Sequence, residues 1–435
     1  MKFYLKWIFI IIFLFIATNI NAQQAKSDSL LLNEAIKLAL TNQPLLQEAL
    51  HQVDAAAAKV KQQKSFYYPN VTGDASYVRI GPIPTIQFGG LGFTLAPDNN
   101  YDAHVSASEL LYDFGRRDAL VNLTESYKLS SQDKIKLIKN NLTYQTIGAF
   151  YAALFLEKSI EVKDEQINTL KQHIEITRKK VQSGSATDFD ILTTEVRVAS
   201  AENEKIDIQN ALAKEKIYLK SLLGWPSNKE LNITGVLEMD SSGVSLDSLI
   251  SEALSKRPEM KLAQDAENSA VLSKHIASLE DKPSLSVMAT YGFKNGFEPN
   301  LDVLRGNWAA GINASLPIFN GNLKDAKIEE AEANIKTSSA KILELERSIK
   351  AEVEQAAANL NASRLKIKTS AIQVNQAKQA VSRAELQYKA GVITNLDLID
   401  AETSLSAAEL LQLRVSYENV INMFSLKEAA GETIN

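Results

Sequence analysis

Apolar residues recur at every seventh position through a long stretch in the second half of the chain. The positions of this repeat are Val353, Leu360, Ile367, Val374, Val381 and Tyr388. A seven-residue repeat held over five intervals predicts a left-handed coiled coil, because an ordinary amphipathic core helix seldom keeps this phase for so long. The neighbouring positions are often small, which would allow helices to approach closely: Ala356, Ser363, Ser370 and Ala377.

The first half of the chain carries the same pattern 207 residues earlier, with one departure at Thr146. The matching apolar positions are Ala153, Ile160, Ile167, Ile174 and Val181. No proline interrupts 113–183 or 320–390, so each stretch predicts a helix of roughly 100 Å at about 1.5 Å per residue. Gly148 lies near the departure and should weaken the first of these helices.

Four shorter helical stretches flank the two long ones. They cover about 30–66, 187–223, 246–281 and 394–430. Pro44 and Pro258 fall within the first and third stretches and should bend or break them. Two short stretches end to end match the length of one long helix. This suggests a cylinder wall in which long helices run beside pairs of shorter ones.

Four further segments alternate between an apolar face and a face of small polar residues. They are 71–77, 101–111, 285–293 and 307–316. Aromatic residues stand near their ends, as in the lipid-interface girdle of outer-membrane strands: Tyr77, Tyr101, Tyr291 and Trp308. An antiparallel sheet on a soluble core explains less well why the polar face is so uniform. The connecting segments 81–100 and 294–306 are predicted to be loops.

Four strands in one chain cannot close a barrel, because the smallest known barrels have about eight. Unpaired strand edges are not tolerated in lipid, so oligomerisation is implied. Three chains would give twelve strands, and two would give eight around a narrower lumen.

The chain is an internal duplication. Pro44 matches Pro258 and Tyr77 matches Tyr291 at an offset of 214, and the offset is 207 from Tyr112 onward. The difference of seven residues falls in the loop region, and the long helices align without a gap. We therefore divide the chain into a first repeat at 23–227, an inter-repeat linker at 228–245 and a second repeat at 246–435.

The first 22 residues have the layout of a secretory signal peptide. Lys2 and Lys6 precede the apolar run WIFIIIFLFI, and Ala22 provides a small residue for cleavage. The run is too short for the ~18 apolar residues that a membrane anchor needs. We expect the mature chain to be exported.

The composition narrows the chemistry. The chain has no cysteine, and its net charge of -5 comes from interspersed charges without a basic patch, so we expect neither thiolate chemistry nor nucleic-acid binding. The four histidines, His51, His104, His173 and His275, lie on separate elements and are interpreted as surface or lumen residues. No HExxH, P-loop, GxSxG or dinucleotide motif is present. We expect no enzyme activity, cofactor or metal.

The order of a signal peptide and a doubled unit of helix, strand, loop, strand, long helix, glycine turn and helix resembles the TolC-like outer membrane efflux protein family. The most specific marks are LYDFGRRDAL at 111–120 and PIFNGNLKDAKI at 317–328, at the strand-to-helix junctions. The helix turns add GSATDFDIL and GVITNLDLIDAE. The resemblance covers nearly the whole mature chain.

This resemblance implies a mainly α-helical homotrimer. A twelve-stranded β-barrel in the outer membrane, with four strands per chain, would continue into a long antiparallel coiled-coil barrel in the periplasm. The family's members serve as exit ducts of tripartite efflux or type I secretion systems. They contact outer-membrane lipid, a periplasmic adaptor (membrane fusion) protein and an inner-membrane transporter, and they pass small molecules or proteins outward.

The resemblance also assigns site residues at the periplasmic helix turns. Adaptor contact is implied at the two turns: Gly184, Thr187, Gly391 and Thr394. Asp397 and Asp400 would form the pore constriction, and Tyr388, Asp190 and Thr394 would pack or gate near the tip. Threefold symmetry would turn each constriction aspartate into a ring that favours cations and has a raised pKa. A solvated helix face is the alternative for these aspartates.

One position departs from the family. The family prototype has an arginine two residues after the second-turn glycine, bonded to a carboxylate after the first turn. Asp190 preserves the carboxylate, but the arginine position is Ile393, so Thr394 or Asn395 is a candidate for a different latch. The second aspartate is also unique to one repeat, because Thr193 matches Asp400.

A periplasmic adaptor or structural coiled-coil protein is the alternative function. Adaptors also carry helical hairpins, but they lack the duplication and the paired strands with a membrane-type face. Acid–base catalysis by Asp397 and Asp400 is disfavoured, because carboxylates three residues apart on an exposed coiled coil have no pocket.

Overall fold

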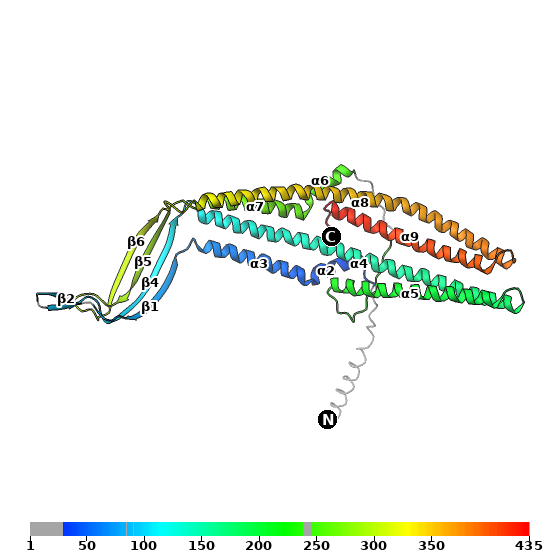
Figure 1. The fold of residues 1–435 in the computed structure, drawn as a ribbon, viewed down its shortest axis with the longest axis horizontal. Coiled ribbons are helices and arrows are strands. Elements are labelled where there is room, and N and C mark those ends of the chain that lie inside the picture. The colour runs from blue at the N-terminus through cyan, green and yellow to red at the C-terminus, as the bar shows by residue number, and fades with distance from the viewer. Residues whose placement is uncertain (1–28, 84, 90, 238–244, 435) are drawn as a thin grey trace, which may run out of the picture. The chain divides into compact units, whose positions relative to one another are not determined.

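The computed structural model describes residues 29–83, 85–89, 91–237 and 245–434. The first repeat contains α2 (Leu32–Asn42), α3 (Pro44–Ser65), α4 (Arg116–Gln182) and α5 (Asp188–Leu222). The second contains α6 (Leu246–Lys256), α7 (Pro258–Ser278), α8 (Leu323–Lys389) and α9 (Asn395–Ala429) (Figure 1). The proposed signal peptide lies outside the described residues.

Corresponding helices of the two repeats have equal lengths. α4 and α8 have 67 residues each, and α5 and α9 have 35 each. The first residues of matching helices are separated by the offset of 207 found in the sequence. These pairs are Arg116 with Leu323 and Asp188 with Asn395. The predicted gap-free correspondence is confirmed. The predicted breaks are confirmed as well, because Pro44 is the first residue of α3 and Pro258 the first of α7.

The chain separates into two compact units, each built from both repeats. One unit comprises the chain up to Gln43, Lys139–Leu249 and Glu352–Asn435. The other comprises Pro44–Ile138 and Ile250–Ala351. The units do not follow the repeats, because α4 and α8 each contribute to both. That 23–227 and 246–435 are the two copies of a duplicated unit remains a prediction.

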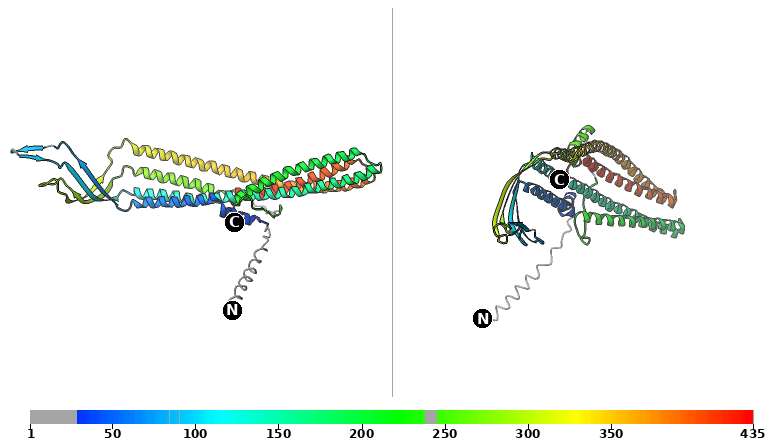
Figure 2. Two further views of the ribbon diagram at one scale, coloured as in Figure 1. Left: turned by 90° about the horizontal axis from the view of Figure 1, so that it is seen from below. Right: turned by 60° about the vertical axis from the view of Figure 1, so that its left-hand side comes forward.

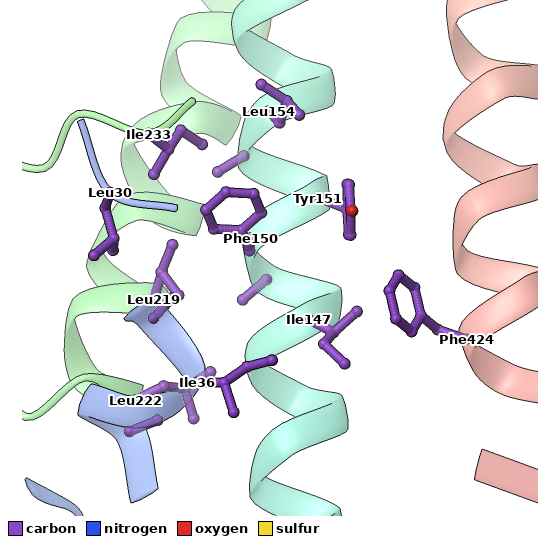
Figure 3. Close-up of a cluster of buried hydrophobic side chains, with 14 of the residues drawn as sticks. Leu30, Ile36, Ile147, Phe150, Tyr151, Leu154, Leu219, Leu222, Ile233 and Phe424 are labelled. Atoms are coloured by element: carbon purple, nitrogen blue, oxygen red, sulfur yellow. The ribbon is translucent and has the colours of Figure 1, made fainter. Parts of the chain in front are cut away.

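The core of the first unit gathers side chains from segments that are distant in sequence. Phe150 of α4, which is 1% exposed, lies among Ile36 of α2 and Leu219 of α5 (Figure 3). Tyr151 faces Phe424 of α9, with ring centroids 5.7 Å apart. Burying a side chain such as that of Phe150 contributes about 1.5–3 kcal/mol to the free energy of unfolding.

The heptad positions of α8 are buried as predicted, apart from one that is half-buried. Val353, Leu360, Val374, Val381 and Tyr388 are buried, whereas Ile367 is half-buried. The small residues Ala356, Ser363 and Ser370 are buried as well. At the departure in α4, Thr146 is fully buried and its hydroxyl donates to the Leu142 carbonyl at 2.7 Å. A polar side chain is therefore tolerated there without an unpaired donor.

The second unit holds an antiparallel sheet in the order β1-β4-β5-β6. The strands are β1 (Asn70–Arg79), β4 (Asn99–Tyr112), β5 (Ser284–Lys294) and β6 (Arg305–Ser315). β4 and β5 join the two repeats within one sheet, and their register shifts near Leu110. β1 and β6 lie at its two edges.

One loop prediction was wrong. Within 81–100, β2 (Thr85–Phe88) and β3 (Leu91–Thr94) form an antiparallel hairpin. The density of glycine and proline favoured a loop, but two glycines between short apolar runs are also the composition of a two-residue hairpin turn. Gly89 has the positive φ of +60° that such a turn needs.

Among the described residues, no helix is both long enough and apolar enough to cross a membrane.

Candidate functional site at the helix turns

Two tight turns link α4 to α5 and α8 to α9 (Figure 2). Gly184 and Gly391 have φ values of +76° and +75°, so both occupy the left-handed region that favours glycine. After each glycine the next amide donates back into the preceding helix, from Ser185 to the Lys180 carbonyl and from Val392 to the Gln387 carbonyl. Both turns are therefore Schellman-type helix ends.

The threonine and aspartate after each glycine form a helix cap. The Asp190 carboxylate accepts from the backbone amide and the hydroxyl of Thr187, both at 2.8 Å. The Asp397 carboxylate does the same for Thr394, at 2.8 and 2.6 Å. This role was not predicted, although a threonine followed three residues later by an acid is the signal of a capping box.

Asp397 and Asp400 have different partners. Hydrogen bonds from Thr394 lower the pKa of the exposed Asp397 carboxyl, which is the opposite direction from the one expected within a carboxylate ring. Asp400 is also exposed, and its Oδ1 lies 3.3 Å from a guanidinium nitrogen of Arg197 on α5. Within one chain, Asp397 therefore caps α9, and Asp400 joins the two hairpins through Arg197.

Tyr388 is 6% exposed and contacts side chains of α4. Its hydroxyl lies 3.2 Å from that of Thr177, and the Lys180 ammonium lies 3.7 Å from the centre of its ring. The same ammonium donates to the Tyr388 carbonyl at 2.6 Å. Packing in the heptad and contacts across the hairpins therefore act together at this residue.

Asn395 is the centre of a buried network between the hairpins. Its amide nitrogen donates to the Asp190 carbonyl at 3.1 Å and to the Thr194 hydroxyl at 3.3 Å. Its carbonyl oxygen therefore faces Nε2 of His173 at 2.5 Å. Because that oxygen can only accept, Nε2 of His173 must carry the proton. Of the two latch candidates, Asn395 reaches across the hairpins, whereas the bonds of Thr394 described above stay within its own cap.

The interpretation of His173 as a surface or lumen residue was wrong. It is 3% exposed, and its ring lies 5.1 Å from that of Tyr388. Burial lowers the pKa of His173 below its ordinary value, and the nearby Lys180 acts in the same direction. The ring is therefore neutral at pH 7. A single histidine in a helical pattern gave no signal of this environment.

The position of the missing arginine is apolar and packed. Ile393 contacts a cluster of Ala384, Tyr388 and Leu398. A charge pair still joins the hairpins, but its direction is reversed. The arginine, Arg197, now belongs to the first hairpin and the carboxylate, Asp400, to the second.

The aromatic residues predicted for the barrel girdle are cross-strand neighbours. Tyr77 of β1 pairs with Tyr101 of β4, with ring centroids 5.1 Å apart. Tyr291 of β5 pairs with Trp308 of β6. All four side chains are exposed on the single chain.

Comparisons with known proteins agree with this architecture. The profile of the family described as "Outer membrane efflux protein" matches residues 35–225 and 249–432. The probable efflux pump outer membrane protein TtgC of Pseudomonas putida is 24% identical, over 92% of this chain and 82% of that protein. The alkaline protease secretion protein AprF of Pseudomonas aeruginosa is 23% identical, over 91% and 83%.

Solved structures share the fold. The crystal structure of CusC superposes with a TM-score of 0.79 at 20% identity, covering 92% of each chain. Two matches of one family profile, on either side of the linker, also fit the duplication inferred from the offset. With the profile covering most of its length, the chain belongs to the outer membrane efflux protein family.

Proposed function

We propose that this outer membrane efflux protein works as a homotrimeric exit duct that receives cargo from a pump assembly in the periplasm. The observation that carries the proposal is the sheet, whose edge strands β1 and β6 have no partner within the described part of the chain. Open edges are not tolerated in lipid, so β6 of one copy pairs with β1 of the next. Three copies close a barrel of twelve strands.

The cross-strand aromatic pairs support a position in the outer membrane. Aromatic side chains are favoured at the boundary between lipid and water, and Tyr291 and Trp308 stand opposite each other with both rings exposed. Tyr77 and Tyr101 form the corresponding pair on the first two strands of the sheet. The helical part then extends into the periplasm.

The helix turns are the proposed contact for a periplasmic adaptor protein. Phe189, the second residue of α5, and Val392, which follows Gly391, are each 71% exposed, so an apolar side chain is presented near each turn. Adjacent Gly184, Thr187, Gly391 and Thr394 shape the turns, as described above. The adaptor would in turn connect the duct to an inner-membrane transporter.

The constriction is proposed at the start of α9. In a trimer, Asp397 and Asp400 would each be present three times on a helix that begins at the tip. Rings of carboxylates favour cations and bind multivalent cations more tightly than monovalent ones. This function needs no catalytic group or cofactor, so we propose that the chain has no enzyme activity.

Both efflux and secretion are compatible with this duct. TtgC carries an efflux-pump name and AprF a secretion name, at nearly equal identity to this chain. The transporter that delivers cargo, which is a separate chain, would decide between small molecules and proteins. We therefore propose a tripartite efflux or type I secretion system without choosing between them.

Fractionation and mass measurement test the proposal. We expect the full-length protein in the outer-membrane fraction and, in detergent, a mass of three chains that conducts ions in planar bilayers. Recovery in the inner membrane or as a soluble protein would instead favour a periplasmic adaptor or structural coiled-coil protein. A stable monomer in detergent would contradict the trimeric barrel.

A further inference from the structure

One face of α9 that packs on the first hairpin carries polar residues at helical spacing. Ile399 belongs to a buried cluster with Leu170 of α4. The Ser406 hydroxyl donates to the Gln166 side chain of α4 at 2.9 Å. Asn395 binds His173 at the other end of this face. Between these contacts lies Glu402, three residues after Ile399 and four before Ser406.

The Glu402 side chain is buried, and one of its two carboxyl oxygens has no partner in the part of the chain that the structure describes. It is only 8% exposed, and its Oε2 atom has no hydrogen-bond partner among the described residues. A buried ionised carboxylate without a partner is costly, so the protonated form is favoured in this packing. No contact in the mechanism proposed above uses this group.

The surrounding charges do not offset an ionised Glu402. From α8, the carboxylate of Glu385 acts on it. From α4, the buried Lys163 is paired with Glu204, and Lys171 is paired with Glu202. The titratable residue His173, also on α4, is neutral and bound to Asn395. From α5, Arg197 is paired with Asp400. Burial first, and then Glu385, raise the pKa of Glu402 to about 7.

We propose that Glu402 is a proton-sensitive catch between the two helical hairpins of each chain. With its carboxyl protonated, α9 packs on α4 as the structure shows. Loss of the proton leaves a buried charge that the Glu385 carboxylate repels, and separation of the hairpins relieves this repulsion by letting water reach the carboxylate. This inference rests on the proposed channel function, because separation of the hairpins would widen the duct at the constriction.

The direction of the effect follows from linkage. In the packed form the carboxyl keeps its proton up to a pKa of about 7, whereas a solvated glutamate has its ordinary value of 4.5. Between these values the packed form therefore binds more protons than the separated form. Its stability relative to the separated form is lost as pH rises from 4.5 to 7. The ratio of separated to packed hairpins should rise by up to about three-hundredfold per chain over this range.

The experiment combines conductance with a distance measurement. His173→Gln serves as the background, because it removes the second titrating group of the interface and keeps a donor for Asn395. Open probability is recorded in planar bilayers from pH 4.5 to 8. Spin labels at Phe189→Cys and Val392→Cys, both highly exposed in an otherwise cysteine-free chain, report hairpin separation by pulsed EPR.

We expect open probability and label separation to rise with pH in this background. Adding Glu402→Gln, a neutral side chain of the same shape, should hold both at their low-pH level throughout. Glu385→Gln leaves Glu402 in place but removes a charge that raises its pKa. The midpoint of the rise in open probability and label separation should therefore move to lower pH. Glu409→Gln is the matched control, because Glu409 lies on α9 but pairs with Lys378, and it should leave the midpoint unchanged.

The outcomes separate this inference from the channel proposal. A pH profile that is unchanged by Glu402→Gln in both measurements overturns the catch. If Glu402→Gln fails to assemble, the midpoint shift of Glu385→Gln decides, and the absence of a shift overturns the catch. A complete lack of conductance contradicts the channel, and the label distances then decide about Glu402 on their own.

Discussion

Arg197 of α5 and Asp400 of α9 form an ion pair of 3.3 Å that joins the two hairpins of one chain. Asp400 follows Asn395 by five residues on α9, and neither member of the pair belongs to the apolar cluster that Ile393 contacts. Both side chains are about half exposed, at 45% and 58%. The hairpins are thus held by a solvated charge pair on the surface and by neutral hydrogen bonds in the interior.

Arg197→Gln should favour the open channel only slightly. An exposed ion pair contributes at most about 1 kcal/mol, so the ratio of separated to packed hairpins should rise by no more than about fivefold per chain. The effect should disappear in 1 M salt, where the screening length falls to about 3 Å. Single-channel recordings of Arg197→Lys provide the control, since lysine keeps a positive charge opposite Asp400 and should retain most of the original open probability. Equal effects at low and high salt would contradict an electrostatic origin.

Asp397→Ala combined with Asp400→Ala should weaken block by multivalent cations. In the proposed trimer the two substitutions remove six carboxylates from the constriction, and charge rings of this kind attract cations. Asp190→Ala is the matched control, because it removes the equivalent helix cap from the first hairpin without touching the constriction. Titration of block in single-channel recordings measures the effect. Unchanged block in the double variant would place the constriction elsewhere.

The long helices could be predicted from the sequence because they follow from local and repeated information. The heptad positions, the proline-free stretches and the offset of 207 each depend only on residue spacing. The β2–β3 hairpin was missed because glycine and proline mark loops and tight hairpin turns alike. Its strands of four residues are also too short to show a clear alternation.

The site was less accessible to prediction. The glycine turns are local and were predicted, and the capping acids at 190 and 397 could have been recognised by their spacing from Thr187 and Thr394. The contact of His173 with Asn395 joins residues 222 positions apart. This contact depends on how one hairpin is rotated about its axis against the other. The seven-residue pattern does not determine which side chains next to the heptad positions then meet.

Gly391→Ala should destabilise the second hairpin by backbone strain alone. A Cβ at this position would have no atom within 4 Å, so the cost is that of an alanine at φ +75°, about 1–2 kcal/mol. Gly148→Ala is the opposite control, because this glycine lies inside α4 with equal free space. It should stabilise by about 0.5–1 kcal/mol. Thermal unfolding of the detergent-solubilised protein compares the two variants. A lower unfolding temperature in both would show that steric crowding, and not the φ angle, determines the cost of adding a Cβ.

His173 should make the hairpin interface weaker in acid. Its pKa is lowered in the folded chain, so the folded state binds fewer protons than the unfolded state below the ordinary value of 6.5. Stability is complete above pH 6.5 and declines as pH falls below it, by at most about 1.4 kcal/mol per pH unit. The sign is opposite to that of Glu402.

Hydrogen exchange of residues 395–406 as a function of pH measures this decline. His173→Gln should flatten the acid side of the profile while keeping the donor to Asn395. His51→Gln is the control, since His51 is largely exposed on α3 and should leave the profile unchanged. An acid side that persists in His173→Gln would assign the effect to another group.

Gly292→Ala should prevent the sheet from forming, because β4 and β5 approach too closely to admit a side chain there. A Cβ at Gly292 would lie 2.3 Å from the Ala103 carbonyl oxygen and 2.5 Å from the His104 Cα. Both atoms belong to the backbone of the paired strand, so no rotamer change can relieve the clash. Gly311→Ala on β6 is the matched control, since its nearest atom is the flexible Met288 Cε at 3.6 Å. We expect Gly311→Ala to assemble normally and Gly292→Ala to yield little or no trimer by native mass measurement of the extracted protein. Normal assembly of Gly292→Ala would mean that β4 and β5 pair in a different register in the assembled barrel, because only then could a methyl group fit between them.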